Sequence, residues 1–113
     1  MDATIYHNPR CSTSRKTLDK LRDAGLEPTV VKYLDTGWTR EQLRQLFADA
    51  GLTPSQAVRK REALYTELNL AEATDDEILE AMVAHPVLVE RPIVVTDKGT
   101  RLARPIESVD EIL

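Results

Sequence analysis

The sequence predicts an α/β fold built on a four-stranded mixed sheet, with flanking helices and a helical insert. Three observations lead to this fold class: a strand–helix–strand pattern at the start of the chain, a helical middle, and a strand–strand–helix pattern at the end. No internal repeat, linker or low-complexity tract interrupts this order. We therefore expect a single domain over residues 1–113.

The first two strands are expected at Ala3 to His7, where apolar and polar residues alternate, and at Pro28 to Leu34, which carries a β-branched run. The residues between them have helical spacing, so the segment is a βαβ unit. A right-handed crossover makes its two strands parallel. The helix is expected to bury Leu18 and Leu21, with Ala24 as a further candidate, and to end just before Gly25.

Three helices are expected in the middle of the chain, because a threonine lies three residues before Gln or Glu in each segment, which is the capping-box pattern. The pairs are Thr39 with Gln42, Thr53 with Gln56, and Thr74 with Glu77. Gly51 is expected to end the first helix, and Pro54 suits the first position of the second. Two apolar faces are assigned to the core: Leu43, Leu46, Phe47 and Ala50, and Ile78, Leu79, Met82 and Val83.

The last quarter of the chain is expected to form a β-hairpin and a short helix. Ile93 to Val95 is one strand, Thr96 to Gly99 is the turn, and the second strand runs through Leu102. A further capping box, Ser108 with Glu111, predicts a final helix that ends at Leu113.

The composition is that of an ordinary globular protein, with 42% hydrophobic and 30% charged residues. A net charge of -4 argues against a nucleic-acid partner, whose backbone selects for excess Lys and Arg. The chain has one cysteine, which excludes an internal disulfide and favours a reducing compartment. No segment reads as a signal peptide or membrane span, so we expect a cytoplasmic protein without a membrane partner.

The single cysteine, Cys11, lies where the first strand passes into the first helix. Most free cysteines are small buried apolar residues. At a helix N-terminus, however, the free N–H groups and the helix dipole favour a thiolate, and nearby cations do the same. Nearby candidates are His7, Arg10, Arg15 and Lys16. Each also has a plainer role, in packing or on a solvated face, and the hydroxyls of residues 12–14 could cap the helix or face a bound oxyanion.

Several thiol chemistries are excluded by the neighbours of Cys11. Ser14 stands where a C-x-x-C couple would have its second cysteine, and Thr17 stands where a phosphatase cradle would have its arginine. His7 and His85 with one cysteine are too few for zinc at any familiar spacing, so no metal is expected. If Cys11 is redox active, the resolving thiol comes from another molecule.

Four segments resemble the ArsC family of glutaredoxin-coupled arsenate reductases over nearly the whole chain. They are YHNPRCSTSRKTL, VRK at residues 58–60, HPVLVERPIVVT and GTRLARP. The cysteine segment is specific, the last two are specific as a pair, and VRK alone is weak. The resemblance implies a thioredoxin-like fold enlarged by a helical insert, in agreement with the element order.

The resemblance also implies the site residues. Cys11 matches the catalytic cysteine, and Arg59, Arg91 and Arg104 match the oxyanion-binding arginines. Supporting roles fall to His7, to Ser14 as a hydroxyl that assists the thiolate, and to Pro92, whose bond to Arg91 is expected to be cis. Guanidinium groups bind tetrahedral oxyanions such as arsenate through paired hydrogen bonds. The role of Arg10 stays open.

The implied reaction is reduction of arsenate to arsenite, as in arsenic detoxification, through a covalent bond between Cys11 and arsenic. Glutathione is the implied co-substrate, glutaredoxin the implied protein partner, and no bound cofactor is needed. We expect a monomer. Two alternatives remain: a glutathione-dependent thiol reductase acting on mixed disulfides, and a regulator resembling the Spx proteins, which usually carry the C-x-x-C absent here.

Overall fold

The computed structural model describes residues 1–113, which form two units. The first unit comprises Met1–Thr36 and Arg91–Leu113, and the second comprises Gly37–Glu90. No helix in either is long and apolar enough to cross a membrane.

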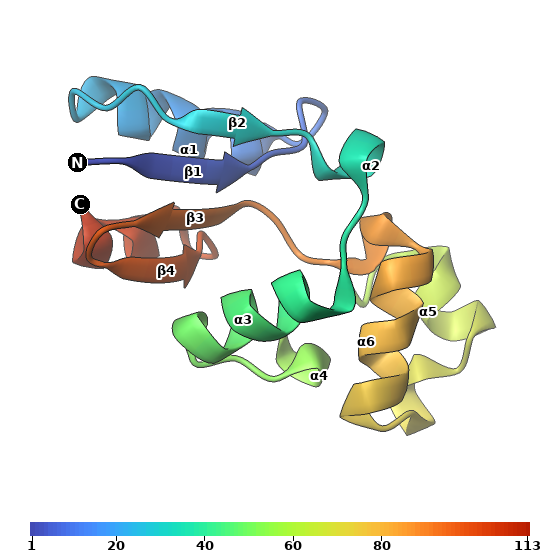
Figure 1. Cartoon of the computed structure of the whole chain (residues 1–113). Coiled ribbons are helices and arrows are strands. Elements are labelled where there is room, and N and C mark those ends of the chain that lie inside the picture. The colour runs from blue at the N-terminus through green and yellow to red at the C-terminus, as the bar shows by residue number, and fades with distance from the viewer. The chain divides into compact units, whose positions relative to one another are not determined.

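A four-stranded mixed sheet forms the centre of the first unit (Figure 1). Its strands are β1 (Ala3–Tyr6), β2 (Thr29–Val31), β3 (Ile93–Thr96) and β4 (Gly99–Leu102), in the order β2-β1-β3-β4. β1 and β2 are parallel, whereas β1–β3 and β3–β4 are antiparallel. The predicted βαβ unit, hairpin and mixed sheet are therefore confirmed.

Helix α1 (Ser12–Asp23) and the 3₁₀ helix η3 (Ile106–Ile112) contribute to one core with the sheet. Ile5 of β1 pairs with Val94 of β3, so the two side chains point to the same face. The fully buried members of this core are Ile5, Leu21, Val94, Ala103, Val109 and Ile112. Leu21 attaches α1 to this core, and Gly25 just past the helix adopts a positive φ of 87°, as the predicted helix end requires.

The second unit is helical. It contains α3 (Arg40–Ala50), α4 (Pro54–Ala57), α5 (Ala63–Glu67), η1 (Leu70–Glu72), α6 (Asp75–Ala84) and η2 (Pro86–Leu88). The three capping boxes predicted for this part of the chain are confirmed, at the starts of α3, α4 and α6. Gly51 ends α3 at a φ of 70°, and Pro54 opens α4. Six of the eight residues predicted for the core faces of α3 and α6 are buried: Leu43, Leu46, Phe47, Ile78, Leu79 and Met82. The other two, Ala50 and Val83, are half-buried.

Three local predictions are wrong. The strand expected over Pro28 to Leu34 is limited to Thr29–Val31, because the amides of Asp35 and Thr36 bond to the carbonyl of Lys32 and form the short helix α2 (Tyr33–Thr36). Ala24 is exposed rather than buried.

The final helix also differs from its prediction. It is the 3₁₀ helix η3, it begins after Pro105, and the capping box expected between Ser108 and Glu111 does not open it. Proline with its fixed φ and missing N–H favours the start of a helical turn, so the helix begins two residues before Ser108.

Candidate active site

The loop between β1 and α1 places Cys11 at the N-cap of α1. The pairing of β1 with β2 continues one residue past β1, because the amide of His7 donates a hydrogen bond to the carbonyl of Val31 at 2.8 Å. The chain then turns, because the amide of Cys11 donates to the carbonyl of Asn8 at 3.0 Å and the amide of Arg10 donates to Asn8 Oδ1 at 3.0 Å. The sulfur is therefore presented at the tip of the helix, half-buried rather than packed in the core.

Burial and three neighbouring groups act on the thiol of Cys11. Burial alone raises its pKa, but this effect is outweighed, so that the pKa lies below its ordinary value. The lowering comes from the backbone N–H of Ser14, then from a hydrogen bond and the charge of Arg91, then from the backbone N–H of Thr13. Cys11 is the N-cap residue of α1, but its side chain forms no capping hydrogen bond of the kind that Ser or Thr forms. The N–H dipoles at the helix end therefore lower the pKa of the sulfur chiefly by electrostatics.

Two arginines meet at this sulfur. Arg91 is 8% exposed and directly precedes Pro92, and the bond between them is cis as predicted. Arg104 follows β4, with Nη2 3.7 Å from Cys11 Sγ, and its Nε donates to the carbonyl of Arg91 at 2.9 Å. A second cis bond, which the sequence did not predict, follows Arg104. The ends of both hairpin strands thus bring guanidinium groups to one thiol.

Ser14 contributes to the site through its backbone more directly than through its hydroxyl. Its Oγ is fully buried, lies 2.7 Å from His7 Nδ1, and accepts a hydrogen bond from the amide of Asn8 at 3.1 Å. Burial lowers the pKa of His7, and the charges of Lys32, Arg15 and Arg22 lower it further. His7 Nδ1 and the Ser14 hydroxyl share one hydrogen bond, and the His7 tautomer decides which of them donates. This bond holds the β1 end against the first turn of α1.

Asn8 is a structural residue that the sequence reasoning missed. It is 5% exposed, and its side chain and carbonyl accept the two bonds that shape the loop before Cys11. The Asn8-Pro9 dipeptide is a turn signal that could have identified it. Arg15, for which a role near the thiol and a solvated position were both open, is exposed, and its Nη1 donates to the carbonyl of Pro9 at 2.8 Å.

Arg59 belongs to the second unit. Its side chain is 17% exposed and forms ion pairs with Glu62, from Nε at 3.1 Å, and with Glu90, from Nη1 at 3.1 Å. Its amide donates to the carbonyl of Leu88 at 2.7 Å. Six of the predicted site residues thus lie together in the first unit: Cys11, Arg91, Arg104, His7, Ser14 and Pro92. The seventh, Arg59, lies in the second unit, where it is paired with two carboxylates.

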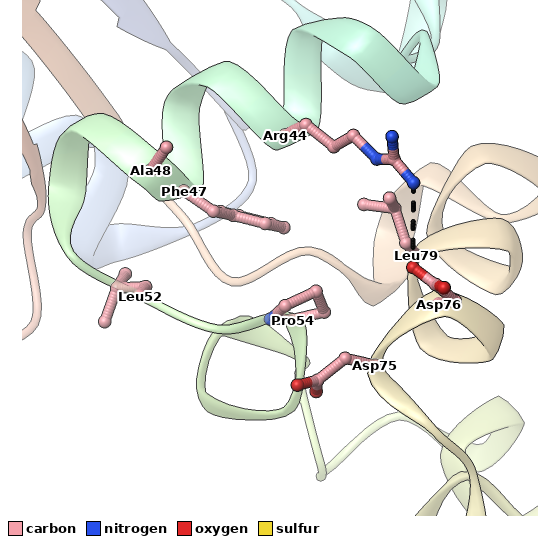
Figure 2. Close-up of a pocket in the computed structure, with 8 residues that line it drawn as sticks. All are labelled: Arg44, Phe47, Ala48, Leu52, Pro54, Asp75, Asp76 and Leu79. Carbon is pink, nitrogen blue, oxygen red and sulfur yellow. Dashed lines mark ion pairs between the residues drawn. The ribbon is translucent and has the colours of Figure 1, made fainter.

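A cavity of about 340 Å³ in the second unit has different chemistry (Figure 2). Its floor is apolar, with Phe47 and Leu79 among its lining residues, and Arg44 forms an ion pair with Asp76 at its edge at 3.6 Å. Asp75 accepts a bond from the amide of Ser55. Its lining has no cysteine, serine or histidine, and we assign it no catalytic role.

The fold and the site together define a thioredoxin-like protein with one helix-tip thiol beside two arginines. The chain belongs to the ArsC family, which it matches over residues 6–112.

Named relatives match nearly the whole chain. The arsenate reductase of Escherichia coli K12 is 53% identical over 112 residues, covering 97% of this chain and 79% of the relative. That of Rhizobium meliloti 1021 is 50% identical over 115 residues, covering 100% and 82%. The solved structure of an arsenate reductase from Vibrio cholerae has a TM-score of 0.93 at 46% identity, covering 100% of this chain and 98% of that one.

Proposed function

We propose that this protein reduces arsenate to arsenite, with the thiolate of Cys11 as the nucleophile and glutathione and glutaredoxin as the electron donors. The observation that carries the proposal is the pair of guanidinium groups, Arg91 and Arg104, at a thiol whose pKa is lowered. The arrangement suits a nucleophile whose substrate is an oxyanion. The names of the relatives from Escherichia coli and Vibrio cholerae support the same substrate.

Arg91 and Arg104 have two roles in this reaction. Before arsenate binds, their charges stabilise the thiolate. When arsenate is bound, their N–H groups hydrogen-bond its oxygens and offset the repulsion between the thiolate and an anionic substrate. Arg59 is proposed as a third oxyanion ligand, in which case the anion competes with Glu62 and Glu90 for its N–H groups.

The first chemical step forms a bond between sulfur and arsenic. The Cys11 thiolate attacks arsenic(V), a protonated oxygen leaves as water, and arsenic stays in the +5 state. A glutathione thiol then replaces a second oxygen, which also leaves as water. Both steps exchange arsenic–oxygen bonds for arsenic–sulfur bonds and move no net electrons.

Reduction follows when the thiolate of glutaredoxin attacks the sulfur of the arsenic-bound glutathione. The electron pair of the sulfur–arsenic bond stays on arsenic, which becomes arsenic(III), and a mixed disulfide of glutaredoxin and glutathione forms. Water then displaces Cys11 from arsenic(III), releasing arsenite and the free thiolate. No second cysteine, metal or bound cofactor in this chain is required, and we propose that a monomer in the reducing cytoplasm suffices.

A coupled assay tests the activity. Purified protein, arsenate, glutathione, glutaredoxin and glutathione reductase should oxidise NADPH in an arsenate-dependent manner, and Cys11→Ser should abolish this oxidation because a serine hydroxyl is not ionised at neutral pH. The Escherichia coli relative serves as the positive control. If it is active while this protein is not, arsenate reduction is the wrong function.

The same assay separates the donors from the substrate. Replacing glutathione and glutaredoxin by thioredoxin and its reductase should abolish turnover. Full turnover with thioredoxin alone would keep arsenate as the substrate and exclude the proposed donors. Turnover of a glutathionylated peptide without any dependence on Arg91 and Arg104 would favour the thiol reductase alternative.

A further inference from the structure

A cavity of about 370 Å³ lies in the first unit beside the loop that carries the nucleophile. One wall is the stretch of residues 7–10, which directly precedes Cys11, and the other comprises Lys32, Leu34 and Asp35, which follow β2. The size is in the range of small-molecule sites, roughly 300 to 1,000 Å³. Cys11 does not itself line the cavity, but Arg10, which does, directly precedes it in the chain.

The walls carry a particular set of charges. Arg10 and Lys32 are exposed cations and Asp35 is an exposed anion. None of these three side chains takes part in an ion pair within the chain. Leu34 adds an apolar surface and is 42% exposed, one of only a few large apolar side chains in the chain with such exposure. The cavity thus offers two cations, one anion and an apolar patch.

Hydrogen bonds hold the part of the loop wall that lies beside the exposed, ligand-binding side chains. Asn8 and His7 are both 5% exposed, and Ser14 bonds to both of them. The charge of Lys32 reaches this wall, because it contributes to the lowered pKa of His7. A ligand in the cavity would therefore meet an ordered, electropositive surface, with Asp35 as its one negative group.

We propose that this cavity binds the thiol co-substrate, a small peptide thiol with two carboxylates and one ammonium group, which is the chemistry of glutathione. The proposal rests on the proposed function and assigns that function a second subsite. Arg10 and Lys32 bind the two carboxylates, Asp35 binds the ammonium group, and Leu34 contacts the backbone between them. Each charged group of this ligand thus has a partner of opposite charge in the cavity. A small inorganic oxyanion would instead be repelled by the carboxylate of Asp35. Binding itself changes no covalent bond.

The direct test uses S-methylglutathione, which keeps all three charges and cannot react. Titration into isotopically labelled protein without arsenate should shift the amide signals of Asn8, Arg10, Lys32 and Asp35. Arg10→Ala and Lys32→Ala should each weaken binding about tenfold, the usual effect of losing one charge-assisted hydrogen bond. The control is Arg44→Ala, which removes an exposed cation of the second unit. It should leave binding unchanged.

A second ligand tests the assignment of Asp35. Asp35→Asn should weaken binding of S-methylglutathione several-fold but leave binding of N-acetyl-S-methylglutathione, which has no ammonium group, as in the wild type. Equal losses for both ligands would overturn this assignment. All the substituted side chains are exposed, so each variant should fold as the wild type does. The amide spectrum of each variant checks this.

The outcomes separate this proposal from the proposed function. Binding at the cavity by a protein that does not reduce arsenate keeps the site and removes the arsenate reaction. An active protein whose cavity signals do not move, or whose Arg10→Ala and Arg44→Ala variants bind equally well, keeps the reaction and overturns the site. Shifts caused equally by sulfate would show a general anion site and would also overturn it.

Discussion

Replacement of Arg104 tests the electrostatic origin of the reactive thiol. The Nη2 atom lies 3.7 Å from Cys11 Sγ. Two unit charges at that separation attract by about 1 kcal/mol in bulk water and about 4 kcal/mol at an effective dielectric constant of about 20. Both groups are half-buried, and the charge of a guanidinium is spread over three nitrogens, so the lower part of this range applies. We expect Arg104→Ala to cost the thiolate about 1 to 2 kcal/mol.

The expected change is a five- to thirtyfold smaller thiolate fraction at a pH below the thiol pKa, by the usual conversion of about 1.4 kcal/mol per factor of ten. Ultraviolet absorbance of the thiolate measures this fraction, and it reports Cys11 alone because the chain has no other cysteine. The rate of alkylation by iodoacetamide over the same pH range gives a second measurement. Arg104→Lys should recover part of the charge effect.

The matched control is Arg101→Ala. Arg101 lies on β4, three residues earlier, and bonds to Glu111 and to the carbonyl of Thr100 rather than to the sulfur. It should leave the thiolate fraction near that of the wild type. An Arg104→Ala protein that titrates as the wild type does, or as Arg101→Ala does, would refute a contribution of Arg104 and leave the lowered pKa to Ser14, Arg91 and Thr13.

Three further predictions concern stability. Ser14→Ala should lower the free energy of unfolding, measured in urea, by about 1 to 3 kcal/mol, because it leaves the Asn8 amide and His7 Nδ1 buried without their hydrogen-bond partner. The control is Ser12→Ala, which changes an exposed side chain. Equal stability of the two variants would contradict the hydrogen bonds of Ser14. Acid should destabilise the fold through His7, because its pKa lies below the ordinary value of 6.5 and the unfolded chain takes up a proton that the folded chain does not. The stability is complete above pH 6.5 and is lost as the pH falls toward the folded pKa; His7→Gln should reduce this loss, and an unchanged slope would assign it to other groups. Gly51→Ala should lower the free energy of unfolding by about 1 kcal/mol, because φ is 70° at this position and alanine is strained there. An added Cβ would have no neighbour within 4 Å, so backbone strain is the whole cost. An unchanged melting temperature would contradict this strain.

Local sequence patterns predicted those parts of the fold that local forces decide. The capping boxes of Thr39, Thr53 and Thr74 formed because each depends only on residues three apart. Ser108 and Glu111 have the same spacing but open no helix, because a tighter 3₁₀ helix already begins after Pro105. The end of β2 was misplaced because Tyr33 is buried in a helical turn rather than a strand, which alternation alone cannot distinguish.

The site was predictable to different degrees for similar reasons. The position of Cys11 at a helix start follows from the order of strand and helix, so its chemistry could be proposed from the residues themselves. Arg91 and Arg104 reach it through the pairing of β3 with β4 and of β3 with β1, contacts between residues far apart in the sequence. No spacing rule identifies them, and only the resemblance to a family did. Nothing in the sequence pointed to Lys32 and Asp35 as neighbours of the cysteine loop.

The distance along α1 between its two anchored ends constrains how this sequence can change. Cys11 sits at the tip of the helix and Leu21, ten residues later, is fixed in the core. One inserted or deleted residue between them would rotate one end by about 100° relative to the other and move it by about 1.5 Å. Either the sulfur would turn away from the guanidinium groups or the leucine would leave the sheet. The exposed positions of this helix, such as Ser12, therefore tolerate substitution, whereas the length of the helix is fixed.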